Sequence, residues 1–311
     1  MATRLVITLL CLLGLASPAF TQNWQYHSSG RFVIAYAANE QKLALQVIAE
    51  LQRQQQALNQ RLEFEPRRTI TIFLCPTQYV FDYLTRSVVP DWGEAAADVS
   101  NWRMFLKSPV ASANRELKPG TLLHELVHLT LAEMVLPGRA PRWFDEGAAT
   151  LLSGDTQHVS PTLISSAMAT RSLVSFDEIE ELLTFRNAQA GLAYSESYHA
   201  VGYLIQKFGE DAIGRFARAL AAHENARAAF QAAFNKDLWD FESEYFDYLR
   251  AKFRWYFLWD DTVLWSAAIL LLVVAGFIVT RRRIKRRMQE WEEEERLSAQ
   301  NDADPEEEKS Y

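Results

Sequence analysis

Apolar and polar residues follow different periods along the chain, and each period predicts a kind of element. Residues 32–36 (FVIAY) and 69–74 (TITIFL) are rich in β-branched and aromatic side chains, which is typical of strands. Between them, residues 39–62 carry apolar side chains at helical spacing. Residues 95–106 indicate a hairpin or an edge strand, because a serine and an asparagine interrupt a strand-like run. The N-terminal part is therefore expected to mix strands with helices.

Helical spacing dominates from residue 121 onwards. The segments with the clearest helical character are residues 121–128, 141–154, 176–183, 195–207, 211–222 and 238–257. Pro119 and Gly120 precede the first segment and Gly154 ends the second, which is typical of helix boundaries. The pattern predicts an α+β domain with a strand-rich N-terminal part and a helical C-terminal part.

Two long apolar runs lie near the ends of the chain. The first, residues 5–16, follows Arg4 and precedes small residues, and it is about half as long as a membrane span. It predicts a secretory signal peptide over residues 1–19, with an uncleaved anchor as the alternative. The second, residues 262–280, would form about 28 Å of helix, close to the thickness of the hydrocarbon core. It predicts one transmembrane helix.

Charges around the second run predict its orientation. A cluster of arginines and a lysine over residues 281–287 follows the run, and an aromatic segment over residues 255–259 precedes it. By the positive-inside rule, residues 281–311 lie in the cytoplasm as a basic flank and an acidic tail with too few apolar side chains to fold. Residues 20–258 then form an extracytoplasmic domain of a single-pass protein of the cell membrane, on the periplasmic side if the organism is bacterial.

Composition narrows the classes of function. The 311 residues are 49% hydrophobic and 23% charged, which is typical of a folded protein. The net charge of −7 provides no cationic field, so we expect no nucleic-acid partner. Cys11 lies in the predicted signal peptide, which leaves Cys75 without a partner for an intramolecular disulfide. Nothing in the sequence indicates the oligomeric state.

The candidate chemistry lies in residues 121–128, TLLHELVH. His124 and His128 are four residues apart, so a helix places both imidazoles on one face, where they can occupy two corners of a zinc tetrahedron. Glu125 lies about 100° around the helix from His124, close enough to hold a metal's water without binding the metal. The alternative is a surface helix that carries two histidines and a glutamate by chance.

A third ligand is expected from residues 141–154, PRWFDEGAATLLSG. Glu146 is the candidate because it stands among apolar residues, where a carboxylate is costly unless a cation or metal pairs with it. Asp145 competes for this role, but adjacent helical residues diverge by about 100°, so only one of the two can face the metal. Gly147 and Ala148 favour Glu146, since small residues allow this helix to approach the first closely.

With HELVH and the later WFDEGA, the sequence resembles the gluzincin metallopeptidases, in particular the peptidase MA-like domains related to the aminopeptidase N family. The resemblance is specific over residues 119–154. It implies one zinc ion bound by His124, His128 and Glu146, with Glu125 as the general base and acid. It also implies a peptide or protein substrate.

Related enzymes also stabilise the negative charge of the transition state with a phenol or imidazole. Tyr194 is the first candidate, with Tyr198 and His199 as alternatives, and a purely packing role for Tyr194 is the competing interpretation. His158 stands alone in polar surroundings and is expected to be a surface histidine. None of these residues belongs to the HELVH or WFDEGA elements.

Two departures from the family pattern limit what the resemblance implies. Residues 93–97, GEAAA, stand where the aminopeptidase N family has a G-x-M-E-N element that holds the substrate's amino terminus, which argues against exopeptidase specificity. Thr150 stands four residues after Glu146, where thermolysin-like enzymes have an aspartate that orients a histidine. In gluzincins an edge strand beside the zinc helix pairs with extended substrate. Residues 95–106 are the candidate here, and an ordinary core hairpin is the alternative.

The sequence therefore predicts a membrane-anchored zinc metallopeptidase that hydrolyses peptide bonds with a zinc-bound water activated by Glu125. The competing hypothesis is a non-catalytic peptidase-like domain that binds a partner or an envelope component, with zinc structural or absent. Glu125 argues against the second hypothesis, because a purely structural site has no need of a base beside its ligands.

Overall fold

The computed structural model describes residues 23–87, 93–109, 118–181, 187–254 and 261–303. The chain divides into two compact units, one ending at Lys252 and the other beginning at Phe253. The signal peptide expected over residues 1–19 lies outside the described residues, as do the aromatic residues over 255–259.

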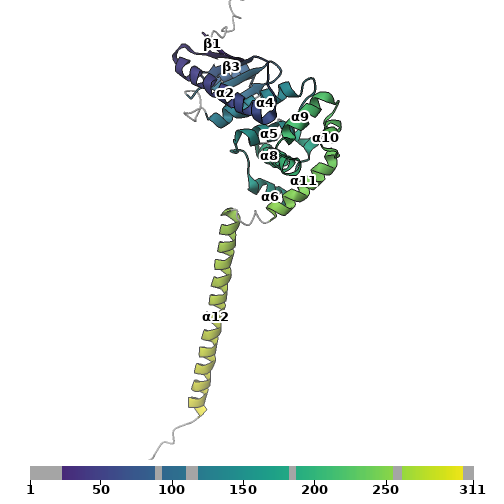
Figure 1. Ribbon diagram of the computed structural model, residues 1–311. Coiled ribbons are helices and arrows are strands. Elements are labelled where there is room, and N and C mark those ends of the chain that lie inside the picture. The colour runs from purple at the N-terminus through teal and green to yellow at the C-terminus, as the bar shows by residue number, and fades with distance from the viewer. Residues whose placement is uncertain (1–22, 88–92, 110–117, 182–186, 255–260, 304–311) are drawn as a thin grey trace, which may run out of the picture. The chain divides into compact units, whose positions relative to one another are not determined.

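A five-stranded mixed sheet opens the first unit (Figure 1). The two outer pairs are antiparallel hairpins, whereas the three central strands run parallel. In sheet order the strands are β1 (Gln25–Ser29), β2 (Phe32–Tyr36), β3 (Ile70–Cys75), β5 (Arg103–Lys107) and β4 (Ala95–Asp98). The strands and the hairpin predicted from the apolar pattern are confirmed. β1 was not predicted, because this mostly polar strand pairs at the edge and has no buried face.

Two helices pack on the sheet. α2 (Gln41–Leu62) follows a short 3-10 turn, η1 (Ala38–Glu40), and contacts β1 and β2. α3 (Gln78–Thr85) contacts β3 and β5 and encloses a core cluster of Cys75, Val80, Phe81 and Phe105. Cys75 is a free, fully buried thiol, and burial raises its pKa to about 12, so it is an inert part of the core.

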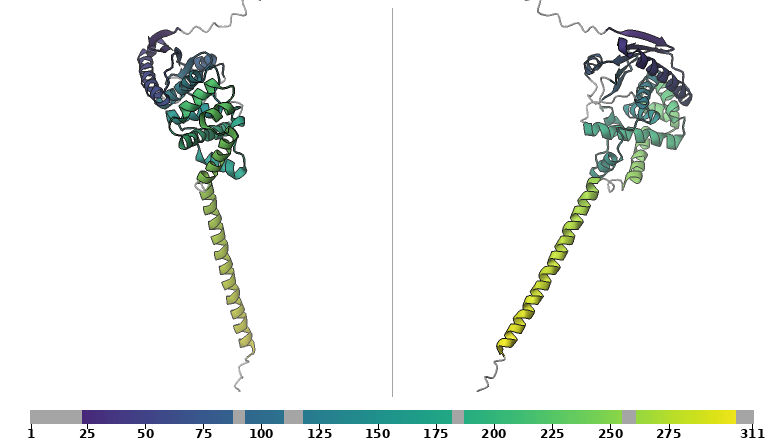
Figure 2. Two further views of the ribbon diagram at one scale, coloured as in Figure 1. Left: turned by 45° about the vertical axis from the view of Figure 1, so that its right-hand side comes forward. Right: turned by 90° about the vertical axis from the view of Figure 1, so that its left-hand side faces the viewer.

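The rest of the first unit is helical, as the sequence predicts, so the α+β class is confirmed (Figure 2). α5 packs against both α4 and α8. The helical core is aromatic: Trp143 stacks on Phe176 with ring centroids 4.3 Å apart. The helices are α4 (Pro119–Met134), α5 (Arg142–Ser153), α6 (Pro161–Thr170), α7 (Phe176–Ile179), α8 (Asn187–Phe208), α9 (Ala212–Ala222), α10 (Ala226–Phe234) and α11 (Leu238–Phe253).

α8 begins at Asn187, eight residues before the helix expected from the apolar pattern. Its first turns contain Gly191 and alanines, which give no clear apolar period. Tertiary contacts stabilise these turns instead, since α8 packs against α6 and Gly191 lies next to Leu163.

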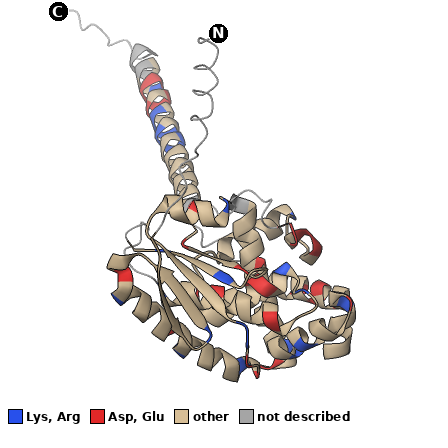
Figure 3. Cartoon of the chain, turned by 90° about the horizontal axis from the view of Figure 1, so that it is seen from above, with Lys and Arg blue, Asp and Glu red and all other residues tan. Residues whose placement is uncertain are grey.

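From residue 261 onwards, the described residues of the second unit form one helix, α12 (Asp261–Ala303). Its apolar part exposes large side chains such as Leu271 (70%) and Val273 (62%). Basic and then acidic residues follow, seen as blue and then red bands in Figure 3. Residues 288–303 belong to the acidic tail that was expected not to fold, but they are helical here, because arginine, glutamate and glutamine all favour helices. Within the described part of the chain, no helix combines the length and apolarity that a membrane span needs.

Candidate metal centre and active site

α4 carries the first two candidate ligands. Pro119 lies in its first turn, where the missing N–H would have no partner within the helix anyway. Leu122, Leu126 and Leu129 are buried and anchor one side of the helix in the core. His124 and His128 lie one turn apart, with ring centroids separated by 4.8 Å and side chains 17% and 10% exposed.

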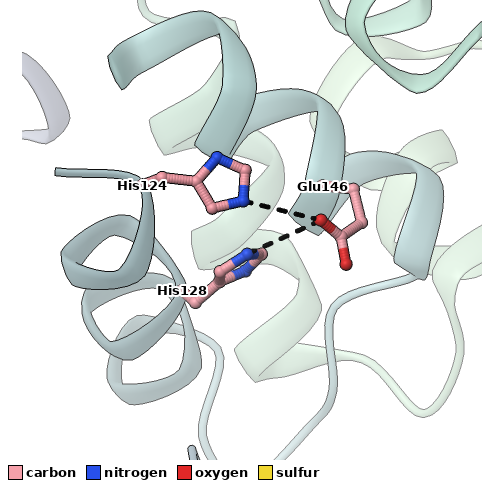
Figure 4. A group of neighbouring side chains, drawn as sticks. All are labelled: His124, His128 and Glu146. Atoms are coloured by element: carbon pink, nitrogen blue, oxygen red, sulfur yellow. Dashed lines mark ion pairs between the residues drawn. The ribbon is translucent and has the colours of Figure 1, made fainter. Parts of the chain in front are cut away.

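α5 brings Glu146 to these two rings (Figure 4). Its Oε2 atom lies 3.7 Å from Nε2 of His124 and 3.6 Å from Nε2 of His128. One ligand atom from each of the three residues lies within 4.8 Å of the other two. The structure therefore brings together the three residues that the sequence singles out as metal ligands.

The spacing and the chemistry of this group fit a zinc ion. Tetrahedral zinc bonds of about 2.0–2.2 Å place neighbouring ligand atoms about 3.4 Å apart. The two nitrogen–oxygen distances, 3.6 and 3.7 Å, are close to this separation. Two imidazoles and one carboxylate are also a donor set of catalytic zinc sites, in which a fourth position stays open.

Asp145 does not compete with Glu146 for the same position. Its Oδ2 atom lies 3.0 Å from Nδ1 of His128, whereas Glu146 faces Nε2 of the same ring. Burial alone would lower the pKa of His128, but the charges of Asp145 and Glu146 outweigh it and raise the pKa to about 10. A metal ion at Nε2 must therefore displace a proton.

Gly147 does not bring α5 close to α4, so that expectation is wrong. A Cβ atom at Gly147 would lie 2.2 Å from the carbonyl oxygen of Ser197, which belongs to α8. Because adjacent helical residues diverge by about 100°, the helix that turns Glu146 toward α4 turns Gly147 toward α8. Only glycine permits this contact between α5 and α8.

Glu125 lines the same cleft as the three candidate ligands but is not one of them. The residue is only 9% exposed, and burial raises the pKa of its carboxyl against the opposing charges of His124 and His128. A raised pKa brings a carboxyl closer to the range in which it can accept and then donate a proton at neutral pH.

A cleft of about 750 Å³ contains the site and is bordered by β4 and α4. Near the start of α4, Oε2 of Glu94 lies 4.0 Å from Nζ of Lys118. Near its end, Glu133 accepts a hydrogen bond from the backbone N–H of Arg68, whose guanidinium lies 4.7 Å from the ring of Trp102. The edge hairpin therefore runs alongside α4.

The backbone of β4 offers hydrogen-bonding groups at this edge. Lys107 N–H donates to the carbonyl oxygen of Glu94, so Glu94 and Ala96 turn their polar backbone groups toward β5. Ala95 and Ala97, which alternate with them, turn theirs away from β5. All three alanines line the cleft, so the strand is an edge strand beside the candidate site and not part of an enclosed core hairpin.

Tyr194 on α8 lines the cleft, whereas Tyr198 and His199 are not among the described residues that do so. The negative charge of Glu146 and burial both raise the pKa of Tyr194, so its hydroxyl keeps its proton and can donate a hydrogen bond. The ring of His158 lies 5.8 Å from the ring of Tyr194, between centroids.

His158 is exposed, as the sequence predicts, and it also lines the cleft. It follows Asp155, whose carboxylate accepts a hydrogen bond of 3.2 Å from the hydroxyl of Thr121 at the start of α4. This contact holds the loop after α5 against the cleft. The loop's polar composition gives no signal of it, because the contact joins segments far apart in the sequence.

Comparison with known families agrees with this geometry. The family model of the peptidase MA superfamily matches residues 79–251, a segment that includes the three candidate ligands, Glu125 and Tyr194. A search of curated proteins found no match to the chain.

Proposed function

Because the chain belongs to the peptidase MA superfamily, we propose that it is a zinc-dependent metallopeptidase of the gluzincin type that hydrolyses bonds in peptides or proteins. The observation that carries this proposal is the group of His124, His128 and Glu146, whose ligand atoms converge beside Glu125 in an open cleft. A surface helix with histidines by chance would not meet a carboxylate from a second helix that is only 12% exposed.

Each residue of the site then has a distinct task. When bound, zinc supplies a Lewis acid that lowers the pKa of water and polarises the scissile carbonyl. Glu125 takes a proton from the attacking water and gives it to the amine nitrogen as the peptide bond breaks. The hydroxyl of Tyr194 donates a hydrogen bond to the carbonyl oxygen as that atom gains negative charge.

The edge strand supports cleavage within an extended substrate. Backbone groups of Ala95 and Ala97 that point away from β5 can pair with a peptide laid along the cleft, which requires little of the substrate's sequence. Residues 93–97 lack the G-x-M-E-N element, so an anchor of that kind for a free amino terminus is missing. We therefore favour an endopeptidase over an aminopeptidase.

Membrane anchoring is a separate proposal and rests on the sequence. Residues 262–280 are apolar, residues 281–287 are basic, and residues 1–19 have the pattern of a signal peptide. Together they favour a peptidase domain outside the cytoplasm, tethered by one C-terminal span with a cytoplasmic tail.

Substitution Glu125→Gln tests the proposed reaction. Glutamine keeps the size of the side chain but cannot accept the proton, so we expect cleavage of fluorescein-labelled casein and of a quenched peptide library to fall by at least about 100-fold. Zinc content, measured by mass spectrometry, should stay at one ion per chain. The exposed Glu210 provides a matched control, and Glu210→Gln should retain both properties.

Two results would contradict the proposal. Undiminished cleavage by Glu125→Gln would exclude the general-base role. A wild-type protein that binds no zinc and cleaves neither substrate would instead favour the non-catalytic domain that binds a partner or an envelope component.

A further inference from the structure

We propose that Asp145 is a positioning residue, which fixes the orientation and the tautomer of the His128 imidazole so that Nε2 faces the metal. The inference rests on the proposed function, because it concerns a ligand of the proposed zinc ion. It assigns to Asp145 a task that the sequence left open, since the aspartate of thermolysin-like enzymes is replaced by Thr150 here.

The two nitrogens of His128 have different partners. Nδ1 lies 3.0 Å from Oδ2 of Asp145, and Nε2 lies 3.6 Å from Oε2 of Glu146. An ionised carboxylate can only accept a hydrogen bond, so contact with Asp145 requires a proton on Nδ1. In the neutral imidazole the lone pair is then on Nε2, the atom that the metal needs. A carboxylate behind a histidine ligand also raises the basicity of the ligating nitrogen.

The position of Asp145 is fixed by its neighbours in the first turn of α5. Trp143 and Phe144 are 1% and 0% exposed, and both pack in the aromatic core. Trp143 stacks on Phe176 at 4.3 Å, and Phe144 meets Phe216 at 4.8 Å between ring centroids. The backbone N–H of Asp145 donates to the carbonyl of Pro141 at 2.9 Å. The carboxylate is therefore held by a rigid part of the fold.

The consecutive residues Asp145 and Glu146 thus face the two different nitrogens of the His128 ring. Adjacent helical side chains diverge by about 100°, which lets Glu146 reach the metal position while Asp145 reaches the opposite nitrogen of His128. Asp145 also lies in the first turn of α5, where the helix dipole favours a negative charge. Two consecutive residues of α5 therefore supply the third candidate ligand and the group that orients the second.

The test measures zinc affinity of metal-free protein by competition with a chromophoric chelator. We expect Asp145→Ala to weaken zinc binding by about 10- to 100-fold, because such partners of a ligating histidine have effects of that size. Asp145→Asn should weaken zinc binding less than Asp145→Ala does, since the amide oxygen of asparagine can still accept the hydrogen bond from Nδ1 of His128. Asp177→Asn is the matched control, because Asp177 is an exposed aspartate in the first turn of α7 and is not among the described residues that line the cleft, so its zinc affinity should equal that of wild type.

A second measurement separates positioning from a general effect on folding. In the zinc-loaded wild type, nitrogen-15 NMR of the histidine side chains should show a proton on Nδ1 of His128 that exchanges slowly with water. Asp145→Ala should lose this slow exchange, and circular dichroism should show an unchanged helix content. If Asp145→Ala does not fold, the nearly isosteric Asp145→Asn carries the test through its smaller but measurable loss of affinity.

The outcomes distinguish this inference from the proposed function. Wild-type zinc affinity in Asp145→Ala, or equal losses in Asp145→Ala and Asp177→Asn, would overturn the positioning role while leaving the zinc site in place. A wild-type protein that binds no zinc would overturn the proposed function and this inference with it.

Discussion

Each side chain of the candidate site has a partner that limits its chemistry. His128 uses Nδ1 for Asp145 and turns Nε2 toward Glu146. Glu146 has its pKa lowered overall, because the nearby charges of the two histidines outweigh the opposing effect of burial. Glu125 has the opposite shift, since burial dominates and raises its pKa. Two neighbouring carboxyl groups are thus suited to different tasks, one as an ionised ligand and the other as a group that exchanges a proton.

Tyr194 is suited to donate a hydrogen bond, and Tyr194→Phe tests this at the scale of one atom. Removing the hydroxyl should lower kcat on a quenched peptide substrate by roughly 100-fold, the usual cost of losing one donor to the transition state, with little change in KM or zinc affinity. Tyr198→Phe is the control, because Tyr198 is not among the residues of the cleft. An unchanged kcat in Tyr194→Phe would leave Tyr194 with a packing role only.

At the scale of elements, three helices and one strand build the site. α4 and α5 supply the candidate ligands, α8 supplies Tyr194, and β4 borders the cleft. The close contact of α5 with α8 at Gly147 sets how α5 is turned about its axis, and this rotation directs Glu146 toward α4. A site built on packed helices keeps its geometry more reliably than one built on loops.

Pairing of a substrate with the edge strand predicts that proline at position 97 weakens binding of an extended peptide. In Ala97→Pro the N–H that points away from β5 is lost, so we expect KM for an extended peptide to rise about fivefold, the value of roughly one hydrogen bond. Zinc affinity should not change. Ala97→Ser keeps the N–H and should keep the wild-type KM. A folded Ala97→Pro variant with unaltered KM counts against this position, and the same result for Ala95→Pro removes the pairing proposal.

At the scale of the whole molecule, the chain separates into a compact domain and a helix with its own charge pattern. The domain contains every residue of the candidate site. The apolar and basic parts of α12, together with the apolar residues 5–16, concern the proposed anchoring of this domain to the membrane.

The proposed topology can be tested on the full chain in cells. With an epitope tag after residue 311, the protein should sediment with membranes and resist extraction by alkaline carbonate. Protease added outside the cytoplasmic membrane should degrade the domain and leave a protected fragment that carries the tag, because the proposed topology places residues 281–311 in the cytoplasm. A variant without residues 262–280 is the control and should appear in the soluble fraction. Full-length protein in the soluble fraction, or a tag degraded from outside, contradicts the topology.

The sequence by itself determined the strands β2 and β3, the edge hairpin and the histidine pair on α4, because these depend on local periodicity and spacing within one element. It also named Glu146, in preference to the adjacent Asp145, as the third candidate ligand, because Glu146 stands among apolar residues. It did not reveal β1 or α3, whose short patterns are weak. Only the tertiary structure decided that Nδ1 of His128 contacts Asp145, that Gly147 faces α8, and that His158 lines the cleft. Those features depend on the rotation and distance of packed elements, which arise from contacts between residues far apart along the chain.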